Sequence, residues 1–245
     1  MKYKIIITAG GTSERIDNVR KITNSGSGKL GSTIANKLIE IKNNYIDKIY
    51  YICSKGSFKP DNEKIEIIEI VDTKDLEMTI RKLLTEEKID YFIHSMAVSD
   101  YTVDYVTTAE KLALNIESNK NSNVTQIISN YKDGITDSKI SSYEENLIIK
   151  LKKTPKIISM IKDISPKTFL VGFKLLDKVS ENELLDVAIK LKDKNKCNIV
   201  IANDLENIRN SSHKAFIIKE NNNYISASDK EDISVKLISE MMNNA

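Results

Sequence analysis

The sequence predicts a doubly wound α/β fold with three layers, in which a mostly parallel sheet lies between two layers of helices. Two observations support this prediction. Apolar, β-branched runs recur along the chain, and most lack the apolar–polar alternation of a strand with one solvated face, which is typical of strands buried on both faces of a parallel sheet. Segments with helical periodicity separate these runs, and regular alternation of strand and helix favours a doubly wound layer fold.

The apolar runs give the expected strands, which cover residues 3–8, 48–53, 65–70, 90–95, 169–173, 198–202 and 215–219. The segments with helical periodicity cover residues 28–43, 73–87, 155–163 and 180–195. A last helix is expected to begin near Ser228, where the sequence SDKE matches a capping box.

One segment departs from this alternation. Residues 139–153, KISSYEENLIIKLKK, predict two short strands joined by the polar turn SSYEEN, and therefore an antiparallel β-hairpin that protrudes from the main fold. The hairpin carries an apolar stripe of Leu147, Ile149 and Leu151. Because an isolated hairpin is only marginally stable in water, this stripe should pack on something. No linker or repeat divides the chain, so residues 1–245 are predicted to form a single domain.

The composition argues against several classes of partner. The chain has 245 residues with 37 Lys and Arg against 35 Asp and Glu, a near balance that indicates neither a nucleic-acid nor a membrane-surface partner. No apolar run is long enough for a signal peptide or a membrane span, so a cytoplasmic location is expected. Cys53 and Cys197 are expected to be two small buried hydrophobes, with a disulfide or a catalytic thiol as the alternative. No spacing of Cys, His and acidic residues suggests a metal site.

The glycine motif GSGKLG at residues 26–31 matches the Gly-x-Gly-x-x-Gly pattern of dinucleotide-binding proteins. Its context does not fit that class. The first strand ends near Thr8 and is followed directly by Gly10 and Gly11, whereas a dinucleotide fingerprint has all three glycines in the first strand-to-helix turn. The motif is no Walker A loop either, because Gly-Lys is followed by Leu30 instead of Ser or Thr.

These glycines predict an anion cradle in two parts. The first part follows strand one and lets the backbone approach a ligand, and the second opens a helix whose free N–H groups and positive dipole end favour phosphate. A plain loop with a Ser-rich cap is the alternative. The residues expected to form the cradle are Gly10, Gly11, Thr12, Ser25, Ser27, Gly28 and Lys29.

Residues 8–31, TAGGTSERIDNVRKITNSGSGKLG, resemble the N-terminal signature of phosphopantothenate–cysteine ligase. The resemblance continues in the family's order over nearly the whole chain. It includes HSMAVSDYT (94–102), Lys139 with Ile140, KLKKTPKI (150–157), LVGFK (170–174) and IVIANDL (199–205). The chain is similar to the monofunctional bacterial form, because it lacks the flavin-dependent decarboxylase domain that is fused in many bacterial members.

The resemblance implies a Rossmann-like fold and a ligase of coenzyme A biosynthesis. The carboxylate of 4′-phosphopantothenate would attack CTP, with loss of pyrophosphate, and the amine of L-cysteine would attack the acyl cytidylate with release of CMP. Mg2+ is expected with the triphosphate, held by phosphate oxygens and water and by no named protein ligand. The resemblance also implies a homodimer, and a separate flavin-dependent decarboxylase that acts next in the pathway.

Three residues take catalytic roles from the resemblance. Asn24 is expected to hold the acyl group and stabilise the intermediate, since a neutral donor suits a mixed anhydride among negative groups, with a helix-entry or turn residue as the alternative. Arg20 is expected to bind a substrate carboxylate or phosphate, with a structural ion pair as the alternative. Lys139 is expected at the triphosphate, with an ordinary surface lysine as the alternative.

The remaining residues implied by the resemblance bind the nucleotide. Asp100 would accept from a base amino group or a ribose hydroxyl, or else serve as a turn acceptor. Gly26 stands where the family has Ser or Thr, and its missing hydroxyl is expected to loosen the cradle. The other expected nucleotide-binding residues are Met96, Ala97, Pro155, Lys156, Ile157, Ile158, Phe173, Lys190 and Lys194.

Two rival functions are weighed against the ligase. An NAD(P)-dependent reductase would need an acidic residue at the end of the second strand, and residues 53–57, CSKGS, contain none. A nucleotide-binding regulator without chemistry would not need both Asn24 and Lys139. The choice of CTP over ATP is not decided by the sequence.

Overall fold

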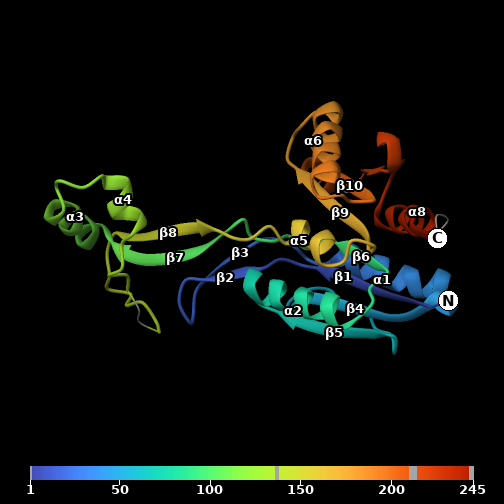
Figure 1. Ribbon diagram of the computed structural model, residues 1–245, viewed down its shortest axis with the longest axis horizontal. Helices are drawn as coiled ribbons and strands as arrows, with labels where there is room; N and C mark the ends of the chain where they lie inside the picture. The colour runs from blue at the N-terminus through green and yellow to red at the C-terminus, as the bar shows by residue number, and fades with distance from the viewer. Residues whose placement is uncertain (1, 136–137, 210–213, 243–245) are drawn as a thin grey trace.

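The computed structural model describes residues 2–135, 138–209 and 214–242, and an eight-stranded sheet forms its centre (Figure 1). The strands lie in the order β12-β11-β10-β9-β6-β1-β4-β5. In chain order they are β1 (Tyr3–Ala9), β4 (Ile46–Ser54), β5 (Ile65–Ile70), β6 (Tyr91–His94), β9 (Phe169–Leu176), β10 (Ile199–Asp204), β11 (Ala215–Ile218) and β12 (Tyr224–Ala227). Of these, only β12 was not expected from the sequence.

Six neighbouring strands of the sheet, from β10 to β5, run parallel. Strand β11 pairs antiparallel with β10 and also with β12. Chain order starts at β1 and moves outward through β4 and β5, then returns to β6 on the other side of β1 and moves outward again. The connections therefore reverse direction between β1 and β6, and such a switch point is where open α/β sheets bind ligands at the carboxyl ends of their strands.

Helices cover both faces of the sheet and give the predicted three layers. Helices α1 (Lys29–Lys42) and α8 (Lys230–Met242) pack on one face, and α2 (Thr73–Glu86), α5 (Ile157–Ile164) and α6 (Glu181–Lys194) pack on the other. Successive strand residues point to opposite faces of the sheet. Ile5 and Ile7 pack in the apolar core on the side of α1 and α8, and Ile6 packs in the core on the side of α2, α5 and α6. Because helices shield both faces of the sheet from solvent, the strands carry apolar residues at consecutive positions. The predicted fold class is confirmed.

Short side chains define where several helices begin. Asp72 caps α2 and Ser180 caps α6, each accepting a hydrogen bond from a backbone N–H of the first turn. Helix α8 begins one residue later than the sequence suggested. Its first turn is capped by the carboxylate of Asp229 and not by the hydroxyl of Ser228. Three short helices complete the body: η1 (Asn43–Tyr45), α7 (Leu205–Arg209) and η2 (Glu220–Asn222).

A long arm projects from the carboxyl edge of the sheet (Figure 1). It consists of β7 (Tyr101–Thr108) paired antiparallel with β8 (Leu147–Lys153), and the helices α3 (Ala109–Ser118) and α4 (Val124–Ser129) lie at its far end. A small apolar cluster around Tyr105, Leu112 and Tyr131 joins the helices to the strands. A protruding antiparallel hairpin is therefore present, as the sequence predicted.

The first strand of that hairpin was predicted wrongly. The partner of β8 is residues 101–108 and not residues 139–140, and SSYEEN is not its turn. Residues 101–108 are rich in Tyr, Thr and Val, which suit a pleated strand, whereas 139–146 offers only one aliphatic residue before Leu147. That residue, Ile140, donates its N–H to the Asp17 carboxylate.

A second small hairpin, β2 (Ser13–Arg15) with β3 (Lys21–Thr23), occupies a segment in which no strand was predicted. It is fixed to the end of β5. The Ser13 N–H donates to the carbonyl of Val71 at 2.8 Å. The buried carboxylate of Glu14 accepts from the N–H and the hydroxyl of Thr73, at 3.0 and 2.7 Å. These bonds hold the hairpin over the carboxyl edge of the sheet.

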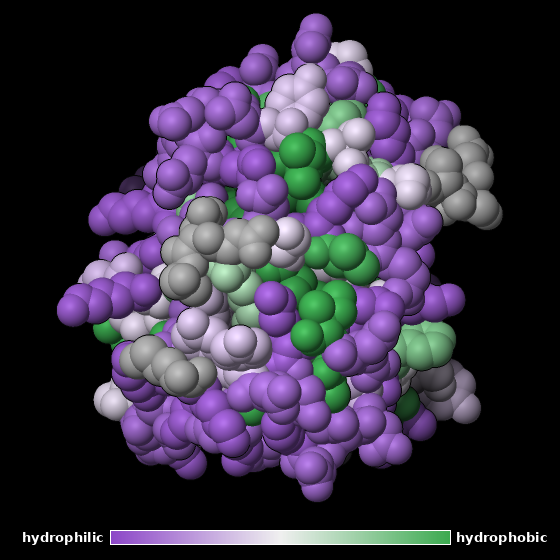
Figure 2. Space-filling view, turned by 90° about the vertical axis from the view of Figure 1, so that its right-hand side faces the viewer, coloured by the Kyte–Doolittle hydropathy of each residue, from purple (hydrophilic) through white to green (hydrophobic). Residues whose placement is uncertain are grey.

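Both cysteines are buried free thiols, as predicted. Burial raises the pKa of Cys53 to about 11 and that of Cys197 to about 12, so neither is a thiolate at neutral pH. Within the described ranges, no helix is both long enough and apolar enough to cross a membrane. Figure 2 shows the end of the molecule away from the arm, where hydrophilic side chains surround a small apolar area.

The tip of the β2–β3 hairpin is tied to the segment that returns from the arm through one carboxylate. Asp17 accepts from the backbone N–H groups of Arg20, Val19 and Ile140, at 2.7, 2.8 and 3.1 Å. It also pairs with the Arg20 guanidinium. The backbone bond from Arg20, followed by the other bonds to the charged form, holds the pKa of Asp17 well below its usual range.

Replacing Asp17 with Asn should therefore lower the melting temperature at neutral pH. Because the pKa is depressed in the folded state, the stabilisation by Asp17 is present above the unfolded-state value of about 4 and is lost as pH falls toward the lower folded-state value. The difference in melting temperature between wild type and Asp17→Asn should shrink as pH falls below about 4. Asp61→Asn, at an exposed aspartate, is the control. A difference that stays constant down to acid pH would contradict this assignment.

Candidate functional site

The loops after β1 and β6 continue to pair beyond the sheet, at the switch point. The Ser95 N–H donates to the carbonyl of Thr8 at 3.1 Å, and the Ala97 N–H donates to the carbonyl of Gly10 at 2.8 Å. The Thr12 N–H then donates back to the carbonyl of Ala97 at 3.1 Å. These bonds fix the two loops as a rigid floor, and they satisfy backbone groups that would otherwise face the site unpaired.

A third loop, residues 24–28, packs directly against this floor. The Asn24 N–H donates to the carbonyl of Thr12 at 3.1 Å. A Cβ atom on Gly11 would lie 2.0 Å from the carbonyl oxygen of Asn24, and one on Gly26 would lie 2.4 Å from that of Gly10. At Gly26 the missing side chain lets two backbones meet, and the expectation that the lost hydroxyl loosens the cradle stays a prediction. Gly11 likewise allows a close contact with the backbone of Asn24.

The same loop ends in the amino terminus of α1. Gly28, the N-cap, has φ of 73°, a conformation that favours glycine, and no side chain caps the helix. The hydroxyl of Tyr51 donates to the carbonyl of Gly28 at 3.3 Å and to that of Phe58 at 2.9 Å, which fixes the loop from below. The first turn of α1 contains no acidic residue. The Lys29 N–H donates to the Ser27 hydroxyl at 3.3 Å, and the amino terminus of this helix, with its positive dipole end, suits an anion.

A cavity of about 550 Å³, called here the first cavity, lies at this switch point. Most of the predicted binding residues line it. They are Gly10, Ser25, Ser27, Gly28, Lys29, Met96, Ala97, Asp100, Pro155, Lys156, Ile157, Ile158 and Phe173. The structure thus brings together residues from five separate parts of the sequence.

Several residues of the first cavity were not predicted. Lys174 follows Phe173 on β9, and Lys230 is the first residue of α8. Burial and the nearby charge of Lys29 together lower the pKa of Lys230. This repulsion between two ammonium groups would be relieved by a bound anion.

The side chain of Asn203, at the end of β10, also lines the first cavity. It is 5 % exposed, and its Nδ2 is buried without a hydrogen-bond partner. A buried unpaired donor costs free energy, and native structures leave few of them without a reason. A ligand acceptor would satisfy it. Its position at the carboxyl end of an expected strand, within IVIANDL, was a sequence signal that could have identified it.

His94, at the end of β6, supplies a neutral ring to the first cavity. Its Nδ1 lies 2.8 Å from the hydroxyl oxygen of Thr8, and that same oxygen accepts from the Met96 N–H. Burial lowers the pKa of His94 to about 4, so the imidazole is uncharged at neutral pH.

A second cavity, of about 420 Å³, lies on the other side of the 24–28 loop. Ser25 and Gly26 line both cavities and form the wall between them. Gly11 and Asn24, both predicted site residues, line the second cavity. The Asn24 amide is bonded to the loop after β6: its Nδ2 donates to the carbonyl of Ala97, and its Oδ1 accepts from the hydroxyl of Ser99, both at 3.4 Å.

Five predicted site residues line neither cavity. Thr12 is buried, and its hydroxyl accepts from the Ser99 N–H at 2.9 Å, so it supports the floor. Arg20 pairs with Asp17 and donates to the carbonyl of Ile140, which is the structural alternative raised above. The other three are Lys139, Lys190 and Lys194.

Those three lysines are all exposed to solvent, and none of them faces a cavity. Lys139 is exposed beside the segment that contacts Asp17. Lys190 and Lys194 are exposed on α6, while Leu191 of the same helix reaches the first cavity. Successive helical residues point about 100° apart, so the neighbours of a residue that faces the cavity point elsewhere.

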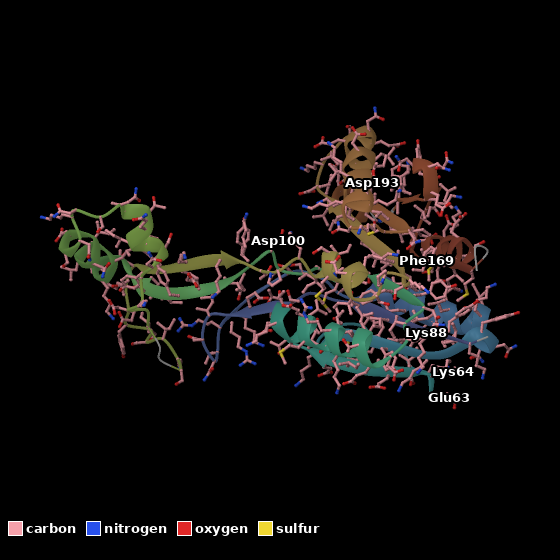
Figure 3. The ribbon with its side chains drawn as sticks, viewed as in Figure 1. Glu63, Lys64, Lys88, Asp100, Phe169 and Asp193 are labelled. Atoms are coloured by element: carbon pink, nitrogen blue, oxygen red, sulfur yellow. The ribbon has the colours of Figure 1, made fainter. Side chains whose placement is uncertain are left out.

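Asp100 lies where the arm leaves the body (Figure 3). Its carboxylate pairs with the ammonium of Lys156 at 2.5 Å, and both side chains are about two-thirds exposed. The hydroxyl of Thr154 donates to the carbonyl of Ser99, and the Thr154 N–H donates to that of Asp100. The base of the arm therefore also forms one rim of the first cavity.

Together, the strand order and the anion cradle define a Rossmann-like α/β protein with a ligand site at the switch point. The sequence matches the family described as DFP, the DNA/pantothenate metabolism flavoprotein C-terminal domain, over residues 1–136 and 106–244. The chain belongs to this family, which confirms at the family level the resemblance noted in the sequence.

Individual relatives agree with this membership. The chain is 30% identical over 215 residues to the coenzyme A biosynthesis bifunctional protein CoaBC of Thermococcus kodakarensis, covering 88% of this chain and 44% of the relative. It thus spans less than half the length of that curated relative. The crystal structure of the DNA/pantothenate metabolism flavoprotein from Streptococcus pneumoniae is 37% identical, with a TM-score of 0.86, and covers 99% of this chain and 100% of that one. A Cab2 variant in complex with phosphopantothenate-cysteine shares the fold, at 16% identity, a TM-score of 0.70, and coverage of 99% and 86%.

Replacing Gly11 with Ala should displace the 24–28 loop, because the new Cβ would overlap the Asn24 carbonyl. We expect a lower melting temperature, by a few degrees or more for a loss of about 1–3 kcal/mol by overpacking. Gly56→Ala is the matched control, since a Cβ there meets no atom within 4 Å. Thermal unfolding followed by circular dichroism makes the comparison. Equal melting temperatures for the two variants would contradict the close packing of these loops.

Proposed function

We propose that this chain is a ligase of coenzyme A biosynthesis that joins 4′-phosphopantothenate to L-cysteine. The carboxylate attacks the α-phosphorus of CTP, pyrophosphate leaves, and an acyl cytidylate forms. The amine of cysteine then attacks the acyl carbon, and CMP leaves with the electron pair of the broken bond. The runner-up functions are an NAD(P)-dependent reductase and a nucleotide-binding regulator without catalytic activity.

The observation that carries this proposal is the pair of cavities on either side of Ser25–Gly26, with the Asn24 amide bonded to the loop after β6. A ligation that proceeds through an acyl nucleotide needs two substrates whose reacting groups meet. Two adjoining cavities with one shared wall provide that arrangement. Holding both reactants in place removes much of the entropic barrier to their reaction.

The first cavity suits the nucleotide. Its volume lies within the range of ligand sites, roughly 300–1,000 Å³. Lys29, Lys174 and Lys230 provide positive charge, and the uncapped start of α1 provides N–H donors. The unpaired Asn203 amide is a donor for a nucleotide oxygen or ring acceptor. The apolar segment at Ile157 and Ile158 offers a surface for the base.

Asn24 suits the reacting acyl group. Its amide is neutral, so it can donate to an oxygen that gains negative charge without repelling the carboxylate that approaches. Both hydrogen bonds of the amide are 3.4 Å long and therefore weak. Replacing the bond that Nδ2 donates with one to a substrate oxygen therefore costs little free energy. We assign Asn24 to positioning the acyl group and stabilising the intermediate.

The relatives support the substrate assignment. The Thermococcus relative is described as a coenzyme A biosynthesis protein, and the Cab2 variant was solved with phosphopantothenate-cysteine. In the described part of the chain, no three His, Cys, Asp or Glu side chains converge on a metal site. We therefore assign no protein ligand to Mg2+, which would arrive with the triphosphate, and route no step through it.

A homodimer remains part of the proposal. Leu147, Ile149 and Leu151 of β8 are each more than one-third exposed and alternate along one face of the arm. A second copy of the chain would cover this stripe. We keep Lys139 and Arg20 as candidate contributors to a site completed by the dimer, and Lys190 and Lys194 only as long-range positive charges. A flavin-dependent decarboxylase acting next in the pathway and a cytoplasmic location belong to the same proposal.

The reductase is disfavoured although the strand order suits it. Helix α1 begins at Lys29, and the β2–β3 hairpin lies between it and β1, so the first turn cannot deliver a pyrophosphate to the helix as a dinucleotide fingerprint does. Residues Ser54–Gly56 follow β4 and provide no carboxylate for a ribose.

Replacing Asn24 with Asp should nearly abolish product formation and leave the fold intact. The new negative charge would repel carboxylate and phosphate, and losing one such electrostatic contact typically costs about a hundredfold in rate. Asn44→Asp, at an exposed site away from the cavities, is the control. Turnover by Asn24→Asp within about threefold of wild type would remove this residue from the mechanism.

The assay for the proposal as a whole measures pyrophosphate release from CTP or ATP. Release should require 4′-phosphopantothenate, and product should require L-cysteine. Faster release with CTP than with ATP supports the proposed nucleotide. No release with either nucleotide, by protein whose fold is intact, would contradict the ligase.

A further inference from the structure

We propose that Asp17 is a positioning residue for the ligase reaction and that it acts through Lys139. Asp17 lies at the tip of the β2–β3 hairpin, and Lys139 lies in the segment that returns from the arm. The inference rests on the proposed function, in which Lys139 contributes a cation to a site completed by the dimer. Asp17 lines neither cavity. It holds the backbone from which Lys139 reaches the triphosphate.

The two oxygens of the Asp17 carboxylate have different partners. Oδ1 accepts from the N–H groups of Val19 and Arg20, at 2.8 and 2.7 Å, and closes the turn at the hairpin tip. Oδ2 accepts from the Arg20 guanidinium and, at 3.1 Å, from the N–H of Ile140, which lies 123 positions later in the chain. One oxygen therefore serves the local turn, and the other joins two distant segments.

Two further hydrogen bonds flank Lys139. The Asn18 N–H donates to the carbonyl of Ser138 at 3.0 Å, and the Arg20 guanidinium donates to the carbonyl of Ile140 at 2.6 Å. The hairpin tip therefore holds the residue on each side of Lys139. We call these contacts between residues 17–20 and 138–140 the clasp. The clasp fixes the backbone of a lysine whose own side chain takes no part in it.

Burial distinguishes the residues of the clasp from the lysine that they hold. The Asp17 side chain is 1 % exposed and Ile140 is 2 % exposed. Lys139 is exposed, and in the described part of the chain its ammonium forms no ion pair. A buried carboxylate is costly unless it is fully bonded, and here its bonds fix the backbone beside an unpaired cation. A charged group carried on a fixed backbone loses less entropy when it meets a reacting group.

Asp17→Asn separates the two roles of the carboxylate. The new side chain has nearly the same shape and keeps Oδ1 for the turn, but Nδ2 replaces Oδ2 and faces the N–H of Ile140 as a second donor. Asp17→Ala removes both sets of bonds. The melting temperature should therefore fall further in Asp17→Ala than in Asp17→Asn.

Activity should follow the clasp and not the total loss of bonds. Both variants should slow pyrophosphate release at saturating CTP by about tenfold or more, as expected for loss of a hydrogen bond to a charged group. Asp61→Asn, at an exposed aspartate, is the control and should release pyrophosphate at the wild-type rate.

A double-mutant cycle with Lys139→Ala distinguishes positioning from a general effect on the fold. If Asp17 acts through Lys139, Asp17→Asn should slow release about tenfold in the wild-type background and less than about twofold in the Lys139→Ala background. Attack by cysteine on preformed acyl cytidylate involves no triphosphate. A cysteine chase after single-turnover formation of that intermediate should therefore be slowed less by Asp17→Asn than pyrophosphate release is.

Limited proteolysis tests the clasp without substrates. Trypsin cleaves after lysine, and in the wild type the bond between Lys139 and Ile140 is protected, because the Ile140 N–H is bonded and its side chain is buried. Asp17→Asn should speed cleavage of this bond about tenfold, since cleavage follows the population of the opened segment. Cleavage after Lys82, within α2, reports general unfolding and should change less.

Several results would overturn this inference and leave the ligase standing. They are release at the wild-type rate by Asp17→Asn or by Lys139→Ala, equal slowing by Asp17→Asn in both backgrounds, and cleavage after Lys139 that does not increase more than cleavage after Lys82. A wild type that releases no pyrophosphate with either nucleotide would overturn the proposed function, and this inference with it.

Discussion

The site depends on one steric constraint, the direct contact of three backbones at the switch point between β1 and β6. Gly11 and Gly26 allow this contact, because a Cβ atom on Gly11 would lie 2.0 Å from the backbone oxygen of Asn24 and one on Gly26 would lie 2.4 Å from that of Gly10. The contact brings the start of α1 over the end of the sheet, and it separates two cavities with a wall only two residues wide. The position of Asn24 and the shape of the proposed anion site both follow from it.

Electrostatics reinforces this geometry. The first cavity brings together Lys29 and Lys230, and burial together with the charge of Lys29 lowers the pKa of Lys230. His94, beside them, stays neutral, since burial lowers its pKa to about 4. A site that repels its own cations and leaves the Asn203 amide unpaired is organised for a ligand and not for stability.

Much of this could be predicted from the sequence, because strand burial and helix periodicity leave local patterns. The parallel sheet followed from such patterns, and half of the lining residues of the first cavity were expected from the glycine motif and from the family resemblance. Contacts between distant segments left no local pattern. The pairing of β8 with residues 101–108 was missed because the strands are separated by two helices, and Lys230 was missed because only the tertiary fold brings α8 to α1. The bond between Arg20 and Asp17 also could not be read from the sequence, which left a structural ion pair and a ligand contact as alternatives.

The central claim is that the two cavities hold the two reacting molecules on either side of Ser25–Gly26. A crystal structure of the protein with a stable sulfamate analogue of the acyl cytidylate tests it most directly. We expect the nucleoside in the first cavity, the acyl carbonyl beside the Asn24 amide, and the remaining chain directed into the second cavity. An analogue that lies wholly within the first cavity, with its acyl chain away from Asn24, would contradict it.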